Sequence, residues 1–157
     1  MNRIKRIAVG VDFSVYSPRV LKYAAESAER MSAEIIAVNV FNQRRMKEAI
    51  GMIHDEETCR KIMDTYVNDE MEKRNIKMNA LINSSMPKEV SYRTIIRTGM
   101  PFEEILKVID DEDANLLIIS SRGRTDFQDY MFGTTAEKLF RHAPVSVLSL
   151  NLIDELF

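Results

Sequence analysis

The chain alternates between short, uninterrupted hydrophobic runs and longer segments in which hydrophobic residues recur every three or four positions. The runs predict strands that are buried on both faces, and the longer segments predict amphipathic helices. The predicted strands are, in chain order, Arg6 to Asp12, Glu34 to Phe41, Ser91 to Arg97, Asn115 to Ser120 and Val145 to Leu150. Strands that alternate with helices in this way predict an α/β domain built on a parallel sheet with helices on both faces.

Helical spacing fills the segments between these strands. Ser17 to Met31 places its hydrophobic residues on one stripe, with Ser17 as the expected N-cap and Pro18 at the first helical position. The remaining helices are predicted over Gln43 to Ser84, Phe102 to Asp110 and Ala136 to His142. Each predicted helix therefore separates two predicted strands.

The segment from Gln43 to Ser84 is long and strongly charged. Its hydrophobic residues still recur at helical spacing, and we expect Gly51 to break or kink its first part. These residues are Cys59, Ile62, Met63, Tyr66, Val67, Met71, Met78 and Leu81. Several of the ten methionines fall here, where they either fill irregular gaps in the core or form an adaptable surface for a partner.

Length and composition indicate one domain with a sizeable core, because 45% of the 157 residues are hydrophobic. The formal net charge of -2 does not favour broad binding to nucleic acid or to an anionic membrane. Only about five apolar residues follow the basic segment Arg3 to Arg6 near the start of the chain. This is too few for a signal-peptide core or a membrane span. A single cysteine, Cys59, excludes an intrachain disulfide and favours the reducing cytoplasm.

A loop of small residues follows the fourth predicted strand and runs from Ser120 through Gly123 to Arg124. Nine residues separate Gly123 from Gly133, which opens the last helix together with two threonines. Backbone N–H groups and a helix N-terminus would then face one hollow, which favours an anion such as phosphate. The glycines could instead serve turns, Thr134 could cap its helix and Arg124 could be solvated.

The spacing of this loop resembles the nucleotide-binding signature of the universal stress protein family, usually G-x2-G-x9-G-[ST]. Here it is Ser120-x2-Gly123-x9-Gly133-Thr134, so that a serine replaces the first glycine. The resemblance extends over most of the chain. The matching segments are Ile7 to Ser14, Thr98 to Ser120 and Arg141 to Leu150, whereas Gln43 to Lys88 lacks a clear counterpart.

The resemblance implies a single doubly wound domain over residues 1–157, with a five-stranded parallel sheet in the order 3-2-1-4-5. Ligands of such sheets bind where the strand order reverses, here between the first and fourth strands. The implied ligand is ATP or a related adenine nucleotide, with the need for magnesium left open. Asp12 would contact the nucleoside part, and the backbone at Val40 would face the adenine. The expected nucleotide-binding residues are Val11, Asp12, Val40, Ile119, Ser120, Arg122, Gly123, Arg124, Gly133, Thr134 and Thr135.

The sequence offers no clear catalytic or metal-binding residues. The P-loop pattern and its lysine are absent, and His54 and His142 lie far apart without partners at ligand spacing. Asp12 is the only evident base, and it could simply cap the turn before Ser17. We therefore expect a stress-response regulator rather than a dedicated enzyme, with room for slow ATP hydrolysis.

The last predicted strand, Val145 to Leu150, would lie at a sheet edge with almost no charge, which invites pairing with another chain. Members of the resembled family commonly dimerise through this strand, so we expect a homodimer; a downstream protein partner stays unidentified. The main alternative is a nucleotide-free dimeric interaction module of the same fold, in which Ser120 closes the pocket. A third is a nucleotidyl-transfer or flavin-binding α/β enzyme, whose signature loops are missing here.

Overall fold

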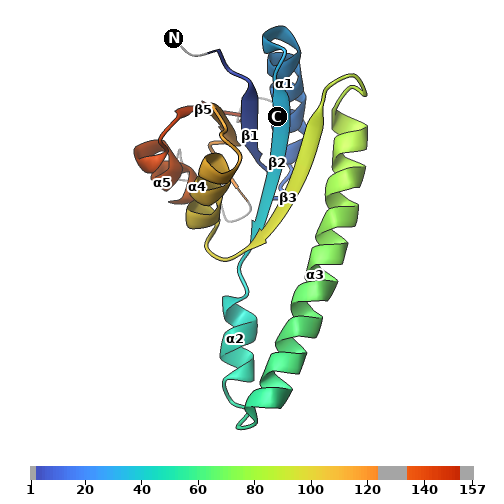
Figure 1. Ribbon diagram of the computed structural model, residues 1–157, viewed down its shortest axis with the longest axis vertical. Coiled ribbons are helices and arrows are strands. Elements are labelled where there is room, and N and C mark those ends of the chain that lie inside the picture. Colours follow the sequence, from blue (N-terminus) through green and yellow to red (C-terminus); the bar gives the residue numbers. More distant parts are fainter. Residues whose placement is uncertain (1–2, 124–133, 153–157) are drawn as a thin grey trace.

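The protein, seen in a computed structural model that describes residues 3–123 and 134–152, has a parallel sheet in the order β3-β2-β1-β4-β5 (Figure 1). The strands are β1 (Arg6–Gly10), β2 (Glu34–Phe41), β3 (Tyr92–Thr98), β4 (Leu116–Ser120) and β5 (Ser146–Leu150). This order confirms the fold expected from the sequence. The order reverses between β1 and β4, so a crevice is expected beyond the carboxyl ends of these two strands.

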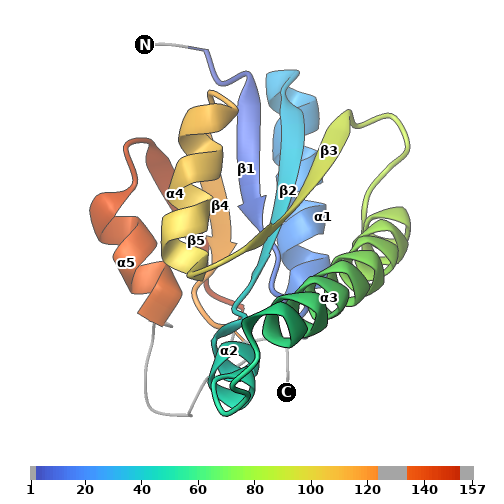
Figure 2. The same ribbon diagram turned by 60° about the horizontal axis from the view of Figure 1, so that its bottom comes forward.

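Helices cover both faces of the sheet. They are α1 (Ser17–Met31), α2 (Arg44–Ile50), α3 (Glu56–Ser85), α4 (Pro101–Asp111) and α5 (Thr134–His142). Figure 2 shows α1 and α3 on one face of the sheet and α4 and α5 on the other. No helix in the described ranges is both long and apolar enough to cross a bilayer.

The core lies in two layers, one on each face of the sheet, and the central strands contribute to both. Ile7, Val9 and Ile118 point toward α1 and α3, whereas Ala8 and Leu117 point toward α4 and α5. Because alternate residues of one strand are buried on opposite faces, the strands appear in the sequence as unbroken hydrophobic runs.

The prediction that the first strand reaches Asp12 was wrong, since β1 ends at Gly10. The Val11 amide still donates to the Val38 carbonyl at 2.8 Å, but the Val11 carbonyl accepts from the Asn39 side chain at 2.7 Å instead of from a neighbouring strand. The ladder of backbone hydrogen bonds therefore ends one residue before the hydrophobic run does, and Asp12 lies in the loop before α1.

The predicted helical segment over Gln43 to Ser84 forms two helices, which we call the α2–α3 arm (Arg44 to Ser85). As expected, the first helix ends beside Gly51. Asp55 caps α3 by accepting hydrogen bonds from the Glu57 amide and the Thr58 hydroxyl, and the Thr58 bond lowers the pKa of Asp55 below its ordinary value. Figure 1 shows the arm extending past the carboxyl ends of the strands.

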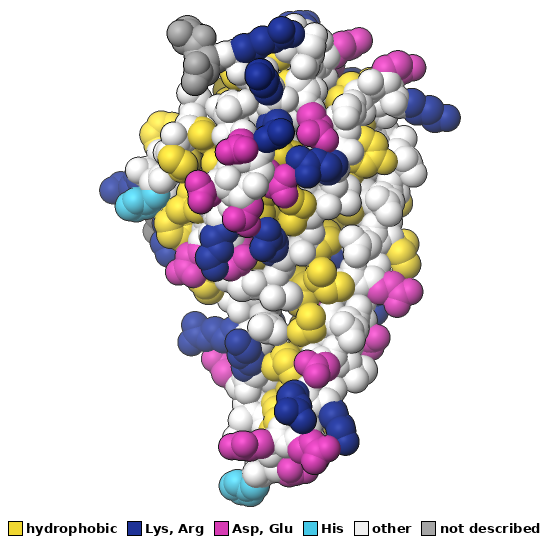
Figure 3. Space-filling view, viewed as in Figure 1, with side chains coloured by type: hydrophobic (Ala, Val, Ile, Leu, Met, Phe, Trp, Pro, Cys, Tyr) yellow, Lys and Arg dark blue, Asp and Glu magenta, His cyan; other side chains and the backbone are white. Residues whose placement is uncertain are grey.

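The buried face of α3 is confined to its second half. Met78 and Ile82 are fully buried there, while the upstream residues of the predicted stripe are only partly buried or, like Ile62, exposed. Figure 3 shows hydrophobic side chains along the line where α2 meets α3, with charged side chains on either side. Among the methionines, the core-filling interpretation is confirmed for Met78, whereas Met52 at the tip is 86% exposed.

Candidate functional site

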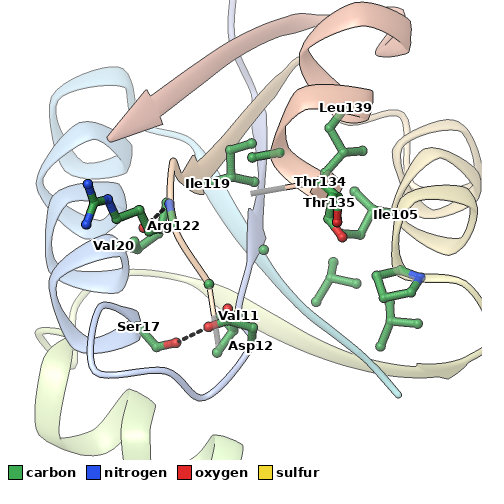
Figure 4. Close-up of a pocket in the computed structure, with 17 residues that line it drawn as sticks. Val11, Asp12, Ser17, Val20, Ile105, Ile119, Arg122, Thr134, Thr135 and Leu139 are labelled. Atoms are coloured by element: carbon green, nitrogen blue, oxygen red, sulfur yellow. Dashed lines mark hydrogen bonds between the residues drawn. The ribbon is translucent and has the colours of Figure 1, made fainter. Parts of the chain in front are cut away.

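A pocket of about 160 Å³, open to solvent, lies beyond the carboxyl ends of β1 and β4, where the strand order reverses (Figure 4). The residues expected from the sequence that line it are Val11, Asp12, Val40, Ile119, Ser120, Arg122, Gly123, Thr134 and Thr135. Arg124 and Gly133, which complete the expected set, lie outside the described residues. The fold thus brings together side chains that are up to 124 positions apart, from Val11 to Thr135.

The pocket also has walls that the loop motif did not indicate. These are Gly10, Ser17, Val20, Val38, Pro101, Ile105, Ala136 and Leu139. Ser17 and Pro101 each begin a helix that follows a strand of the sheet. A search for helix starts after predicted strands, in addition to the glycine motif, would have found both residues.

The two oxygens of the Asp12 carboxylate have different neighbours, one in the turn before α1 and one in the loop after β4. Its Oδ1 accepts hydrogen bonds from the Ser14 amide at 3.0 Å and from the Ser17 hydroxyl at 3.1 Å. Its Oδ2 faces Gly123, where an added Cβ would come within 2.8 Å. The turn-capping role considered for Asp12 is therefore real. It leaves Oδ2 without a donor among the described residues.

Ser120, which replaces the first glycine of the motif, turns its side chain back onto its own loop. The Ser120 hydroxyl accepts a hydrogen bond from the Arg122 amide at 3.2 Å, and the Ser121 amide donates to the Leu150 carbonyl at 2.9 Å. Within the described chain, the Gly123 amide has no acceptor. The serine thus occupies one loop amide, and the pocket beside it stays open.

Three helices begin at the pocket. Ser17, Pro101 and Thr134, the first residues of α1, α4 and α5, all line it. The N–H groups in the first turn of a helix have no partners within the helix, and the helix dipole places partial positive charge there. At α1 these groups are used or absent, because the Ser17 and Arg19 amides donate to the Ser14 and Tyr16 carbonyls and Pro18 has no N–H. The start of α5, with Thr134 and Thr135 at the pocket, is therefore the helix end that best suits an anionic group.

The remaining lining separates into an apolar and a polar side. Val11 and the valines of β2 line the pocket together with Ile105, Ile119 and Leu139, which are apolar. The threonines of α5 and the loop after β4 supply polar groups. Of the lining residues, only Asp12 and Arg122 carry charge. Figure 4 shows the Arg122 side chain running toward α1, away from Thr134 and Thr135. The arrangement suits a ligand with a flat apolar part and an anionic tail.

The site has few groups for catalysis. Asp12 is its only carboxylate among the lining residues, and the lining includes no histidine or lysine. Nowhere in the described ranges do three or more His, Cys, Asp or Glu side chains gather in a way that could hold a metal ion.

Comparison with known proteins gave consistent matches. The model of the universal stress protein family matches residues 3–150. Universal stress protein MJ0577 of Methanocaldococcus jannaschii is 23% identical over 150 residues, which cover 92% of this chain and 93% of that protein. The solved structure of hypothetical protein MJ0577 superposes with a TM-score of 0.76 at 24% identity, covering 95% of this chain and 96% of that one.

Two further structures share the fold and hold an adenine nucleotide. A universal stress protein from Archaeoglobus fulgidus, solved in complex with dAMP, has a TM-score of 0.65 at 17% identity and covers 96% of this chain and 100% of its own. A universal stress protein solved in complex with cAMP has a TM-score of 0.61 at 15% identity, with 96% and 98% covered. At these identities the similarity establishes the fold alone.

Proposed function

This chain belongs to the universal stress protein family, and from that premise we propose that it binds ATP or a related adenine nucleotide and regulates a stress response in the cytoplasm. The observation that carries the proposal is the pocket itself, an apolar slot whose polar side is formed by the loop at Gly123 and the first turn of α5. A purine fits the apolar part, and the phosphates fit the N-terminus of α5.

In our proposal each wall of the pocket takes one part of the nucleotide. The adenine lies between Val11, Val40 and the side chains of α4, and Oδ2 of Asp12, which has no donor among the described residues, accepts from a ribose hydroxyl. The phosphates lie against the Gly123 amide and the first turn of α5. A magnesium ion here would be held mainly by phosphate oxygens and water, because Asp12 is the one carboxylate that lines the pocket in the described chain.

Regulation rather than turnover is the proposed use of the ligand. Occupancy alters which surfaces the protein presents, and hydrolysis of ATP, if present, is slow because no lysine or histidine stands by the pocket among the lining residues. The complexes of structural relatives with dAMP and cAMP support an adenine nucleotide as the ligand class.

The test is nucleotide occupancy. Mass spectrometry of the small molecules released from purified protein should detect an adenine nucleotide, and calorimetry on the stripped protein should show one ATP bound per chain. An empty extract together with no heat of binding at millimolar ATP would instead support the nucleotide-free interaction module. Titrations with and without magnesium settle whether the metal contributes.

Replacing Ser120 with glycine, which restores the family motif, should raise the affinity for ATP by about three- to tenfold, equivalent to about 0.6–1.4 kcal/mol. The physical reason is that the Arg122 amide, which now donates to the Ser120 hydroxyl, becomes available to a phosphate oxygen. Adenosine, which has no phosphate, should bind with unchanged affinity. Calorimetry with both ligands checks this, and a weaker affinity for ATP would contradict it.

We also propose that the protein is a homodimer through β5, which lies at the edge of the sheet and has no charged residue. Successive residues of a strand direct their backbone N–H and C=O groups to opposite sides. The Leu150 carbonyl points toward β4, where it accepts from the Ser121 amide, so the Val147 amide, three positions earlier, points outward toward a partner strand. Light scattering should give twice the chain mass of 18.1 kDa at micromolar concentration. The variant Val147→Pro, which removes that outward donor but no donor to β4, should be a folded monomer. A dimer that survives this substitution would place the interface elsewhere.

A further inference from the structure

A buried asparagine connects the wall of the pocket to α3. Asn39, on β2, is 2% exposed and uses both ends of its amide. Its Nδ2 donates to the Val11 carbonyl at 2.7 Å, and its Oδ1 accepts from Nη1 of Arg74 at 2.9 Å. Val11 and Val40, the residue after Asn39, both line the pocket. A side chain of α3 therefore reaches the pocket wall through a single intermediary.

Arg74 is held in place by two further contacts. Its Nε donates to Glu70 Oε2 at 3.1 Å, one turn earlier on α3, and its guanidinium lies 4.8 Å from the centroid of the Phe41 ring. The Arg74 and Glu70 side chains are only 19% and 23% exposed. A planar guanidinium can make these three contacts at once, which an ammonium group cannot.

The same stretch of α3 holds the other side of Asp12. Phe13, the next residue, has a φ of 59°, a left-handed conformation that is unfavourable for a bulky side chain and needs support from its surroundings. Lys77, one turn after Arg74, places Nζ 4.8 Å from the centroid of the Phe13 ring. Helix α3 thus contacts the residues on both sides of Asp12, Val11 through Asn39 and Phe13 directly.

We infer that Arg74 is a positioning residue for the nucleotide pocket, and that through Asn39 it couples nucleotide occupancy to the packing of the α2–α3 arm. The inference rests on the proposed function. A bound nucleotide fixes Val11 and Asp12, which holds the Asn39 amide in register with Arg74 and tightens α3 against the sheet. By linkage, the factor by which a bound nucleotide favours the packed state of α3 equals the factor by which loss of the α3 contacts weakens nucleotide binding.

The test uses three variants of the full chain. Arg74→Ala removes the donor to Asn39, and Asn39→Asp keeps an acceptor for Arg74 but cannot donate to the Val11 carbonyl. Arg60→Ala, an exposed arginine on the same helix, is the matched control. Calorimetry with ATP and with adenosine is performed at a temperature where circular dichroism shows every variant to be folded.

We expect Arg74→Ala and Asn39→Asp to weaken ATP and adenosine equally, by about tenfold, because the altered wall faces the base rather than the phosphates. Arg60→Ala should change neither affinity. In hydrogen exchange, ATP should slow the amides of α3 around Arg74 in the wild type but not in Arg74→Ala. A merely structural role would lower stability without removing this ATP-dependent protection.

Folded Arg74→Ala and Asn39→Asp proteins with wild-type affinity for both ligands would overturn the inference. So would protection of α3 that persists in Arg74→Ala. Either result would leave the proposed function intact, since the wild type would still bind ATP. A wild type that binds no adenine nucleotide would remove the proposed function and this inference together.

Discussion

Replacing Gly123 with alanine should lower the affinity for ATP by at least about tenfold, which corresponds to about 1.4 kcal/mol or more. The new Cβ would lie 2.8 Å from Asp12 Oδ2, closer than such a carbon and oxygen can approach. The carboxylate cannot withdraw easily, because its other oxygen is bonded to Ser14 and Ser17. The loop therefore has to move, and the Gly123 amide moves with it away from the phosphates.

The matched control for this prediction is Gly51→Ala in the α2–α3 arm. A Cβ there would meet the Glu48 and Lys47 carbonyls at 3.4 Å, an ordinary contact, and Gly51 does not line the pocket. ATP titrations by calorimetry should therefore separate the two alanine variants while circular dichroism finds both folded. Equal ATP affinity in the two would mean that the contact between Asp12 and Gly123 does not shape the site.

Replacing Met78 with alanine should lower the free energy of unfolding by about 2–5 kcal/mol, the usual cost of truncating a large buried side chain to alanine. Met78 is fully buried where α3 packs against the sheet, so the substitution leaves a cavity in the layer that also contains α1. Urea denaturation followed by circular dichroism measures the difference in unfolding free energy.

Met52→Ala is the control, because Met52 is 86% exposed at the tip of the same arm. Its free energy of unfolding should stay within about 0.5 kcal/mol of the wild type. Similar losses in the two variants would indicate that the tip is as firmly packed as the base of α3, contrary to the burial of these residues.

The strands could be predicted because their physical cause is local, whereas their order and the position of the pocket followed from the family resemblance. Each central strand is buried on both faces, so Ile35 to Val38 in β2, like Leu116 to Ile119 in β4, form an unbroken hydrophobic run. Once the order 3-2-1-4-5 is expected from the family resemblance, the end of β1 and the end of β4 must be neighbours. Asp12 and Gly123 then meet without any further assumption.

The contacts of α3 could not be predicted in the same way. The hydrogen bond from Arg74 to Asn39 joins residues 35 positions apart, and neither hydrophobic spacing nor charge pattern assigns such a partner. Asn39 is a single polar residue within a hydrophobic strand, and the sequence around it does not indicate that its side chain bonds to Val11 and Arg74. The end of β1 was missed for a related reason, because the Asn39 side chain replaces the ladder bond at Val11.

The α2–α3 arm packs against the rest of the molecule over only part of its length, from Tyr66 to the end of α3. Substitutions in the outer part of the arm, from Arg44 to Met63, should therefore leave the residues that line the pocket unchanged. Natural variation can then accumulate in this outer part without change to the pocket. Exchange of the outer part between relatives should alter the surface of the arm and leave the affinity for the proposed nucleotide unchanged.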